Sequence, residues 1–180
     1  MHPIFAPGRM PYLDQFVIPL SGLKPGMHDY KFIVDDEFFR QFAYSQIKSG
    51  KLEVDLELEK EETVLTLRFT INGTVHVMCD RCLDYYDQPV NGLERLIVRF
   101  GETSFEETDE IVVIPSTEHR INVSHYIYEY IHLLLPYKCV HPNGEGGISQ
   151  CNREVTDRLQ SHSGEEQTAD PRWDTLKKLL

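Results

Sequence analysis

The sequence lacks long apolar runs and has few cysteines, and each shortage excludes a class of protein. A membrane-spanning helix needs about 18 consecutive apolar residues, but the densest apolar stretch, IHLLLPY, stops at Pro136. The N-terminal stretch MHPIFAPGRMPYLDQ is interrupted by proline and glycine, whereas a secretory signal needs an unbroken apolar segment. We therefore expect a cytoplasmic protein with no membrane contact. Its four cysteines are then reduced, and they are too few for a disulfide scaffold.

Basic residues are scarce as well, with 18 Lys and Arg against 29 Asp and Glu, so the formal net charge is -11. A protein that coats nucleic acid gains affinity by neutralising phosphates, and this charge disfavours that class. An acidic surface suits a basic protein partner instead. The sequence also lacks a nucleophile elbow, a glycine-rich phosphate loop and a zinc-protease motif. These absences exclude three common kinds of catalytic site, and we expect no small-molecule substrate.

Alternation of apolar and polar residues is the clearest structural signal in the chain. Two runs carry apolar residues at every second position: Leu52, Val54, Leu56 and Leu58, then Leu65, Leu67, Phe69 and Ile71. This period of two predicts two half-buried strands. Asn72-Gly73 favours a tight hairpin turn, so TVHVMC is predicted to fold back as a third strand. LERLIVRF, after Asn91-Gly92, is predicted to be a fourth strand.

Shorter segments flank this meander. DQFVIPLSGLKPGMHDYKFIVDD predicts two early strands, and EIVVIP predicts a short later strand. Apolar residues at three- and four-residue spacing predict a helix that starts at Asp36, is capped by Asp35 or Asp36, and ends at Gly50. INVSHYIYEYIHLLLP predicts a second helix with Asn122 or Ser124 as its cap.

Two cysteines, Cys79 and Cys82, lie three positions apart where the meander leaves a strand. This spacing lets both thiolates turn towards one point, as in half of a tetrahedral zinc site. Cys139, His141 and Cys151 compete for the two remaining ligand places.

Two other interpretations of the pair remain. A redox couple is expected at a helix N-terminus, where the dipole lowers a thiol pKa, but here the pair follows a meander and has acidic neighbours. Cysteines are also often plain buried residues. Because all four cysteines fall in two turn-like segments, we favour a zinc site.

A second group of metal-ligand types lies on the predicted second helix. His125, Glu129 and His132 share one stripe, and EYIH is a Glu-x-x-His motif of the kind found in carboxylate-bridged iron proteins. Such sites need the motif from several helices, and it occurs here once. We therefore interpret the stripe as a solvated helix face.

The predicted fold class is α+β, a mostly antiparallel β-meander sheet with two or three helices and a Cys/His zinc-type staple. A chain of 180 residues with 41% hydrophobic residues can bury one core. We expect a single domain over residues 1–160. The polar and acidic stretch SHSGEEQTAD predicts a flexible linker over residues 161–170. DPRWDTLKKLL predicts a docking helix over residues 171–180.

Four motifs, taken in order, resemble the YceD family of bacterial proteins, which is linked to accumulation of large-subunit ribosomal RNA. They are CDRCL after the meander, LPYKCVH after a helix, a following cysteine, and the closing DPRWDTLKKL. The resemblance covers about residues 79 to 180. It implies a non-catalytic factor in ribosome biogenesis. Its partner would be a ribosomal protein or an assembly factor, with large-subunit ribosomal RNA contacted directly or indirectly.

The resemblance also favours one ligand set, because the family position that matches His141 is either His or Cys. The set is Cys79, Cys82, His141 and Cys151, with Cys139 as the alternative ligand. A zinc ion held by three thiolates and one imidazole has no open position, so such a site is structural. Two rival functions remain, a thiol oxidoreductase that uses Cys79 and Cys82 and an acidic protein-interaction module.

Overall fold

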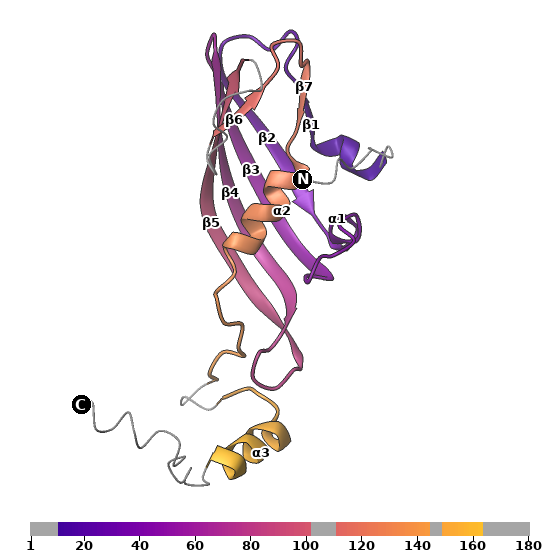
Figure 1. The fold of residues 1–180 in the computed structure, drawn as a ribbon, viewed down its shortest axis with the longest axis vertical. Coiled ribbons are helices and arrows are strands. Elements are labelled where there is room, and N and C mark those ends of the chain that lie inside the picture. Colours follow the sequence, from indigo (N-terminus) through magenta and orange to yellow (C-terminus); the bar gives the residue numbers. More distant parts are fainter. Residues whose placement is uncertain (1–10, 102–110, 145–148, 164–180) are drawn as a thin grey trace, which may run out of the picture. The chain divides into compact units, whose positions relative to one another are not determined.

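Five strands form the main sheet, in the order β2-β3-β4-β5-β6 (Figure 1). The computed structural model describes residues 11–101, 111–144 and 149–163. The strands of this sheet are β2 (Gly26–Val34), β3 (Ser49–Lys60), β4 (Val64–Met78), β5 (Tyr85–Phe100) and β6 (Ile111–Ile114). β2 pairs antiparallel with β3, and β3 antiparallel with β4, whereas β6 runs parallel to β5. The α+β class with a mostly antiparallel sheet is therefore confirmed.

A small second sheet and four helical segments complete the described chain. β1 (Val17–Pro19) pairs antiparallel with β7 (Arg120–Asn122). The helical segments are the 3-10 helix η1 (Pro11–Phe16) and the α-helices α1 (Asp36–Arg40), α2 (Ser124–Leu133) and α3 (Arg153–Ser163). Within the described ranges, no helix has both the length and the apolar character needed to cross a bilayer.

Contacts divide the chain into two units. The sheet unit comprises residues Met1–Val77 and Tyr86–Cys139, and the cysteine unit comprises Met78–Tyr85 and Val140–Leu180. The predicted linker begins inside α3, which extends to Ser163. The rest of that linker and the predicted docking helix over 171–180 lie outside the described residues.

The core of the sheet unit lies between the sheet and α2, which crosses one face of the sheet (Figure 1). The alternation in β3 and β4 buries every predicted apolar position, from Leu52 to Ile71. On α2, the Tyr130 ring packs edge-on against Phe69, with 5.3 Å between ring centroids. Ile127 and Ile131 are fully buried on the same helix. The predicted cap of this helix is wrong, because Val123 is the N-cap and Asn122 lies one position before it, where it accepts the Ser124 N–H at 2.9 Å.

The predicted hairpin turn at Asn72-Gly73 is wrong. Both residues lie inside β4, where Gly73 pairs with Leu52 of β3. A Cβ atom at Gly73 would lie 2.2 Å from the Lys51 carbonyl oxygen, so the glycine is needed for close approach to the neighbouring strand. Gly92 likewise lies inside β5, where a Cβ atom would lie 2.2 Å from Leu134 beyond the end of α2.

The predicted helix from Asp36 to Gly50 is much shorter than expected. Asp35 caps it as predicted, accepting backbone N–H bonds from Glu37 and Phe38. α1 then ends at Arg40, and the backbone continues through three-residue turns, such as the bond from the Ser45 N–H to the Phe42 carbonyl at 3.0 Å. Phe38 and Phe39 are buried, so the aromatic spacing in this segment reflects packing into the core rather than a longer helix. Gly50 is part of β3 and caps no helix.

Candidate metal centre

The turn between β4 and β5 carries the two closely spaced cysteines. The Cys79 N–H donates to the Asp84 carbonyl, and the Leu83 N–H donates to the Cys79 carbonyl, both at 2.9 Å. Leu83 has a φ of 65°, the left-handed region that glycine occupies at no cost. The left-handed conformation costs a residue with a side chain about 1 to 2 kcal/mol. The two hydrogen bonds close the turn tightly despite this cost. Both Cys79 and Cys82 are buried.

The other two residues come from a loop that closes on itself before α3. Asn143 and Ser149 form an antiparallel bridge, and the Cys151 N–H donates to the Ser149 hydroxyl at 3.3 Å. Asn152 then accepts a bond from the Glu154 N–H at 3.1 Å, at the start of α3. Its amide also donates to the Asp84 carboxylate at 3.0 Å, which joins the loop to the cysteine turn.

These two segments bring four metal-ligand types together. The ligand atoms of Cys79, Cys82, His141 and Cys151 all lie within 4.8 Å of one another. The Cys79 and Cys151 sulfurs are 3.8 Å apart, and the Cys82 sulfur lies 3.4 Å from His141 Nδ1. Bond lengths of a tetrahedral zinc site give edges of roughly 3.8 Å between two sulfurs and roughly 3.5 Å between sulfur and nitrogen. The cluster therefore fits one tetrahedral metal ion.

The local electrostatics favour a thiolate at one cysteine. Burial works to raise the pKa of the Cys79 thiol, but it is outweighed by backbone N–H groups of Cys82, Arg81 and His141, which lower the pKa to about 6. One of these donors, the Arg81 N–H, lies 3.4 Å from the sulfur. Burial raises the pKa of the Cys82 thiol, and the neighbouring sulfurs of Cys79 and Cys151 add to this. Thiolates are the form that ligates metal, and a bound cation would offset the negative charge of neighbouring sulfurs.

Cys139 does not belong to the four-residue cluster. It is part of the sheet unit, half-buried, and its thiol lies 3.7 Å from the Pro136 carbonyl. The cluster therefore contains the predicted first set of residues and leaves out the alternative. That these residues ligate a metal remains a prediction.

Sequence reasoning missed the residues that join the two halves of the cluster. Asn152 and Asp84 make this link, and the helix that follows Asn152 was not predicted. The signal was present, because Asn is a preferred N-cap residue and Glu154 follows in the first turn.

The described part of the cysteine unit contains almost no apolar core. Among its described side chains, only those of Cys79, Cys82 and Cys151 are buried. α3 leaves Leu159 51% exposed. A small unit without a core normally needs a disulfide or a metal to fold, and all four cysteines are free.

The stripe on α2 forms no comparable cluster. His125 bonds to Glu129 at 3.0 Å, and both side chains are exposed, as predicted for a solvated face. His132 instead is half-buried, and its Nδ1 donates to the Tyr128 carbonyl at 2.8 Å. Within the described ranges, the Cys79, Cys82, His141 and Cys151 cluster is the one group of at least three such side chains close enough to share a metal.

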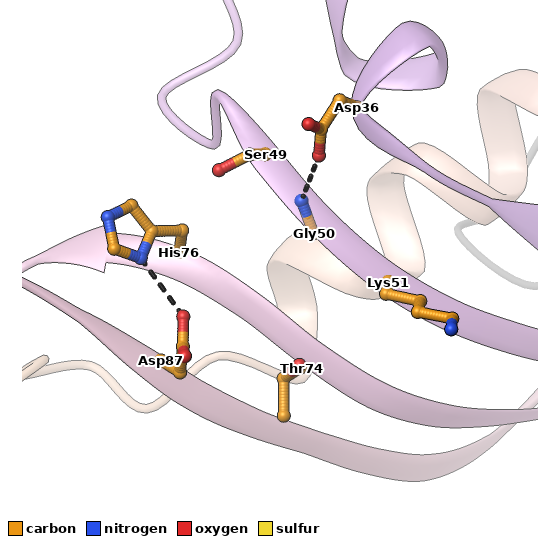
Figure 2. A pocket seen from close by; sticks show the side chains of 7 residues that line it. All are labelled: Asp36, Ser49, Gly50, Lys51, Thr74, His76 and Asp87. Atoms are coloured by element: carbon orange, nitrogen blue, oxygen red, sulfur yellow. Dashed lines mark hydrogen bonds and ion pairs between the residues drawn. The ribbon is translucent and has the colours of Figure 1, made fainter.

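The sheet unit also has a polar groove of about 340 Å³. Figure 2 shows its lining, which comes from the start of α1 and from β3, β4 and β5: Asp36, Ser49, Gly50, Lys51, Thr74, His76 and Asp87. Its polar groups bond to one another, since His76 Nδ1 lies 3.0 Å from the Asp87 carboxylate and the Gly50 N–H donates to Asp36 at 3.0 Å. These bonds link α1 to β3 and β4 to β5, and we assign no ligand to the groove.

Comparison with known proteins points to one family. No curated protein and no solved structure matches the chain. The family described as large ribosomal RNA subunit accumulation protein YceD matches residues 67–180. This segment contains Cys79, Cys82, His141 and Cys151 as well as β5, α2 and α3. Because the match covers more than half of the sequence, the chain belongs to the YceD family.

Proposed function

We propose that this protein is a non-catalytic factor in bacterial ribosome biogenesis that supports the accumulation of large-subunit ribosomal RNA in the cytoplasm. The observation that supports the proposal is the family match over residues 67–180, whose description names accumulation of the large ribosomal RNA subunit. The acidic charge of -11 adds a constraint on mechanism. Such a protein gains little from counterion release on RNA, so its stable partner is a basic ribosomal protein or an assembly factor.

The proposal includes a structural zinc ion bound by Cys79, Cys82, His141 and Cys151. Support comes from the donor set, since three thiolates and one imidazole are typical of structural zinc sites. The sulfur-to-sulfur distance of 3.8 Å and the sulfur-to-nitrogen distance of 3.4 Å add geometric support. All four protein ligands fill a tetrahedral site, so the ion holds the fold and activates no water.

Depletion of the protein in its own host tests the biogenesis role. We expect mature large-subunit ribosomal RNA to fall relative to the small-subunit species, measured by electrophoresis of total RNA. Wild-type protein and the Cys139→Ser variant should restore the ratio, whereas Cys82→Ser should not, because it removes a proposed ligand. An unchanged ratio after depletion would remove the biogenesis role.

The rival function, a thiol oxidoreductase, is favoured by one observation, the Arg81 N–H that lies 3.4 Å from the Cys79 sulfur and helps to lower the pKa of that thiol. A low pKa supplies the thiolate that redox chemistry needs. The two functions differ in thiol reactivity. A structural zinc site protects its thiolates, so the protein purified without chelator should react slowly with a thiol reagent and rapidly after metal removal. Fast reaction of the metal-loaded protein, together with disulfide reductase activity, would favour the rival.

A further inference from the structure

The turn of the cysteine unit exposes three large apolar side chains. Met78, Leu83 and Tyr85 are 49%, 64% and 53% exposed, whereas Cys79 and Cys82 between them are 0% and 3% exposed. Burial of such side chains would stabilise the unit. The apolar surface of this turn is thus turned outward, where it adds little to folding.

The conformation of Leu83 strengthens this observation. Its φ of 65° is disfavoured for leucine and free of cost for glycine. Burial does not compensate the cost, because most of the side chain remains in solvent. Leu83 therefore makes the isolated turn less stable than glycine would, and its side chain is available to another molecule.

Met78 and Tyr85 share a face of the hairpin. The bond from the Cys79 N–H to the Asp84 carbonyl at 2.9 Å pairs residues 79 and 84 across the turn. The next residues outward, Met78 and Tyr85, are therefore opposite each other, and cross-strand neighbours point their side chains to the same face. The two side chains therefore lie on one face at the base of the turn, with Leu83 two residues from Tyr85 in the chain.

The chemistry of this surface favours a protein over a nucleic acid. Methionine, tyrosine and arginine are enriched at the centres of protein interfaces, and the turn presents Met78, Arg81 and Tyr85. Two exposed carboxylates, Asp80 and Asp84, outnumber the single exposed guanidinium of Arg81. This local charge repels phosphates and attracts Lys and Arg side chains.

We propose that Met78, Arg81, Leu83 and Tyr85, here called the turn patch, dock into an apolar recess edged by basic side chains on a large-subunit ribosomal protein. This inference rests on the proposed function, since it names the surface that contacts the basic partner. The role of the metal cluster follows directly. Cys79 and Cys82 lie inside the patch segment, so a metal held there fixes the shape that the partner meets.

The test uses the full-length, metal-loaded chain and individually purified large-subunit ribosomal proteins of the host on a biosensor. The patch variant is Met78→Thr with Leu83→Gly and Tyr85→Thr, and Leu83→Gly alone serves as a variant with no loss of fold. The control variant changes the same residue types on the sheet unit, Met27→Thr with Tyr44→Thr and Leu93→Thr, which are 53%, 92% and 77% exposed. Metal content and circular dichroism confirm that each variant is folded.

We expect at least one ribosomal protein to bind the wild-type chain, with affinity at least tenfold lower for the patch variant and within twofold for the control. Leu83→Gly alone should lower affinity measurably. The absence of any binding ribosomal protein, or equal loss in patch and control variants, would overturn the proposal. Binding to naked ribosomal RNA that only the patch variant loses would assign the surface to RNA. A dimer of this chain lost in the patch variant would assign it to self-association.

Failure of this inference is separable from failure of the proposed function. If depletion lowers large-subunit ribosomal RNA and the patch variant restores it fully, the biogenesis role stands and the turn patch is wrong. If depletion changes nothing, the role is wrong, and the biosensor result alone decides the patch.

Discussion

The two units of this chain differ in what they bury. The sheet unit places Phe, Leu, Ile and Val side chains between its main sheet and α2, and many of them are fully buried. The described part of the cysteine unit buries Cys79, Cys82 and Cys151 and no other side chain. Hydrophobic burial of this kind can stabilise the sheet unit without a metal or a disulfide. In the described part of the cysteine unit, the buried groups that could add stability are these thiols.

This difference predicts independent loss of structure. A metal ion is bound by residues that are not assembled in the unfolded chain, so its binding energy becomes folding energy of the unit that holds it. The sheet unit has no share in that energy, because the four residues of the cluster all belong to the cysteine unit. Each prediction below changes one unit, and the first two measure both.

The largest effect is expected from loss of a ligand. Cys82→Ser should destabilise the cysteine unit by roughly 5 kcal/mol or more, since complete structural zinc sites contribute about 10 to 16 kcal/mol. Hydrogen exchange should accelerate in residues 78–85 and 140–163, while amides of β3 and β4 keep their protection. Cys139→Ser is the matched control and should change little. Equal damage from the two substitutions would mean that the ligand set is wrong.

A core truncation should produce the reverse pattern. Phe69→Ala removes a fully buried ring that packs against Tyr130, and we expect a loss of about 3 to 5 kcal/mol in the free energy of unfolding of the sheet unit. Zinc content of the folded protein should remain unchanged. Tyr44→Ala, at a 92% exposed side chain, serves as the control. Loss of zinc along with the core would show that the units unfold together.

Two glycines of the sheet unit should differ in how they tolerate a methyl group. Gly73→Ala meets backbone atoms of β3 and should cost about 3 kcal/mol, whereas Gly92→Ala meets only the flexible Leu134 side chain and should cost about 1 kcal/mol. Adding Leu134→Ala should remove the clash at Gly92 and leave that at Gly73. Chemical denaturation measures all four variants. If the two glycine variants prove equally stable, β4 does not approach β3 as described.

The smallest effect is expected at Leu83. Leu83→Gly relieves the left-handed strain, partly offset by the greater freedom of glycine in the unfolded chain, and should stabilise the cysteine unit by about 0.5 kcal/mol. Leu83→Ala keeps the strain and should give no gain. Zinc release rates under chelator competition provide the measurement. Faster release from Leu83→Gly than from wild type would contradict the expectation.

The sequence predicted the strands well where one signal was strong. The period of two in residues 52–58 and 65–71 indicates which side chains face the core. Burial of one face strongly specifies the register of a strand. Asn72-Gly73 failed because turn chemistry is local, whereas the close approach of β4 to Lys51 is set by a strand far away in sequence. The aromatic residues after Asp36 failed for a similar reason, since packing in tight turns can mimic helical spacing.

The candidate site was predictable in part. Cys79 and Cys82 form a local motif whose spacing directs two thiolates to one point. Spacing could not decide between Cys139 and His141 as a ligand, because the two residues are only two positions apart. Only the path of the chain after α2 places His141 in the cluster and Cys139 in the sheet unit. The link between Asn152 and Asp84 depends on the same path.

The sequence separation within the cluster has a consequence for the order of synthesis. Cys82 and His141 are 59 residues apart, and Cys79 and Cys151 are 72 apart. At a synthesis rate of about 5 to 20 residues per second on the ribosome, Cys79 and Cys82 are synthesised roughly 3 to 15 seconds before His141 and Cys151. β5, β6, β7 and α2 are all synthesised during this interval. Closure of the complete cluster is therefore a late event, and an assembled cluster marks a chain whose translation has passed the main strands.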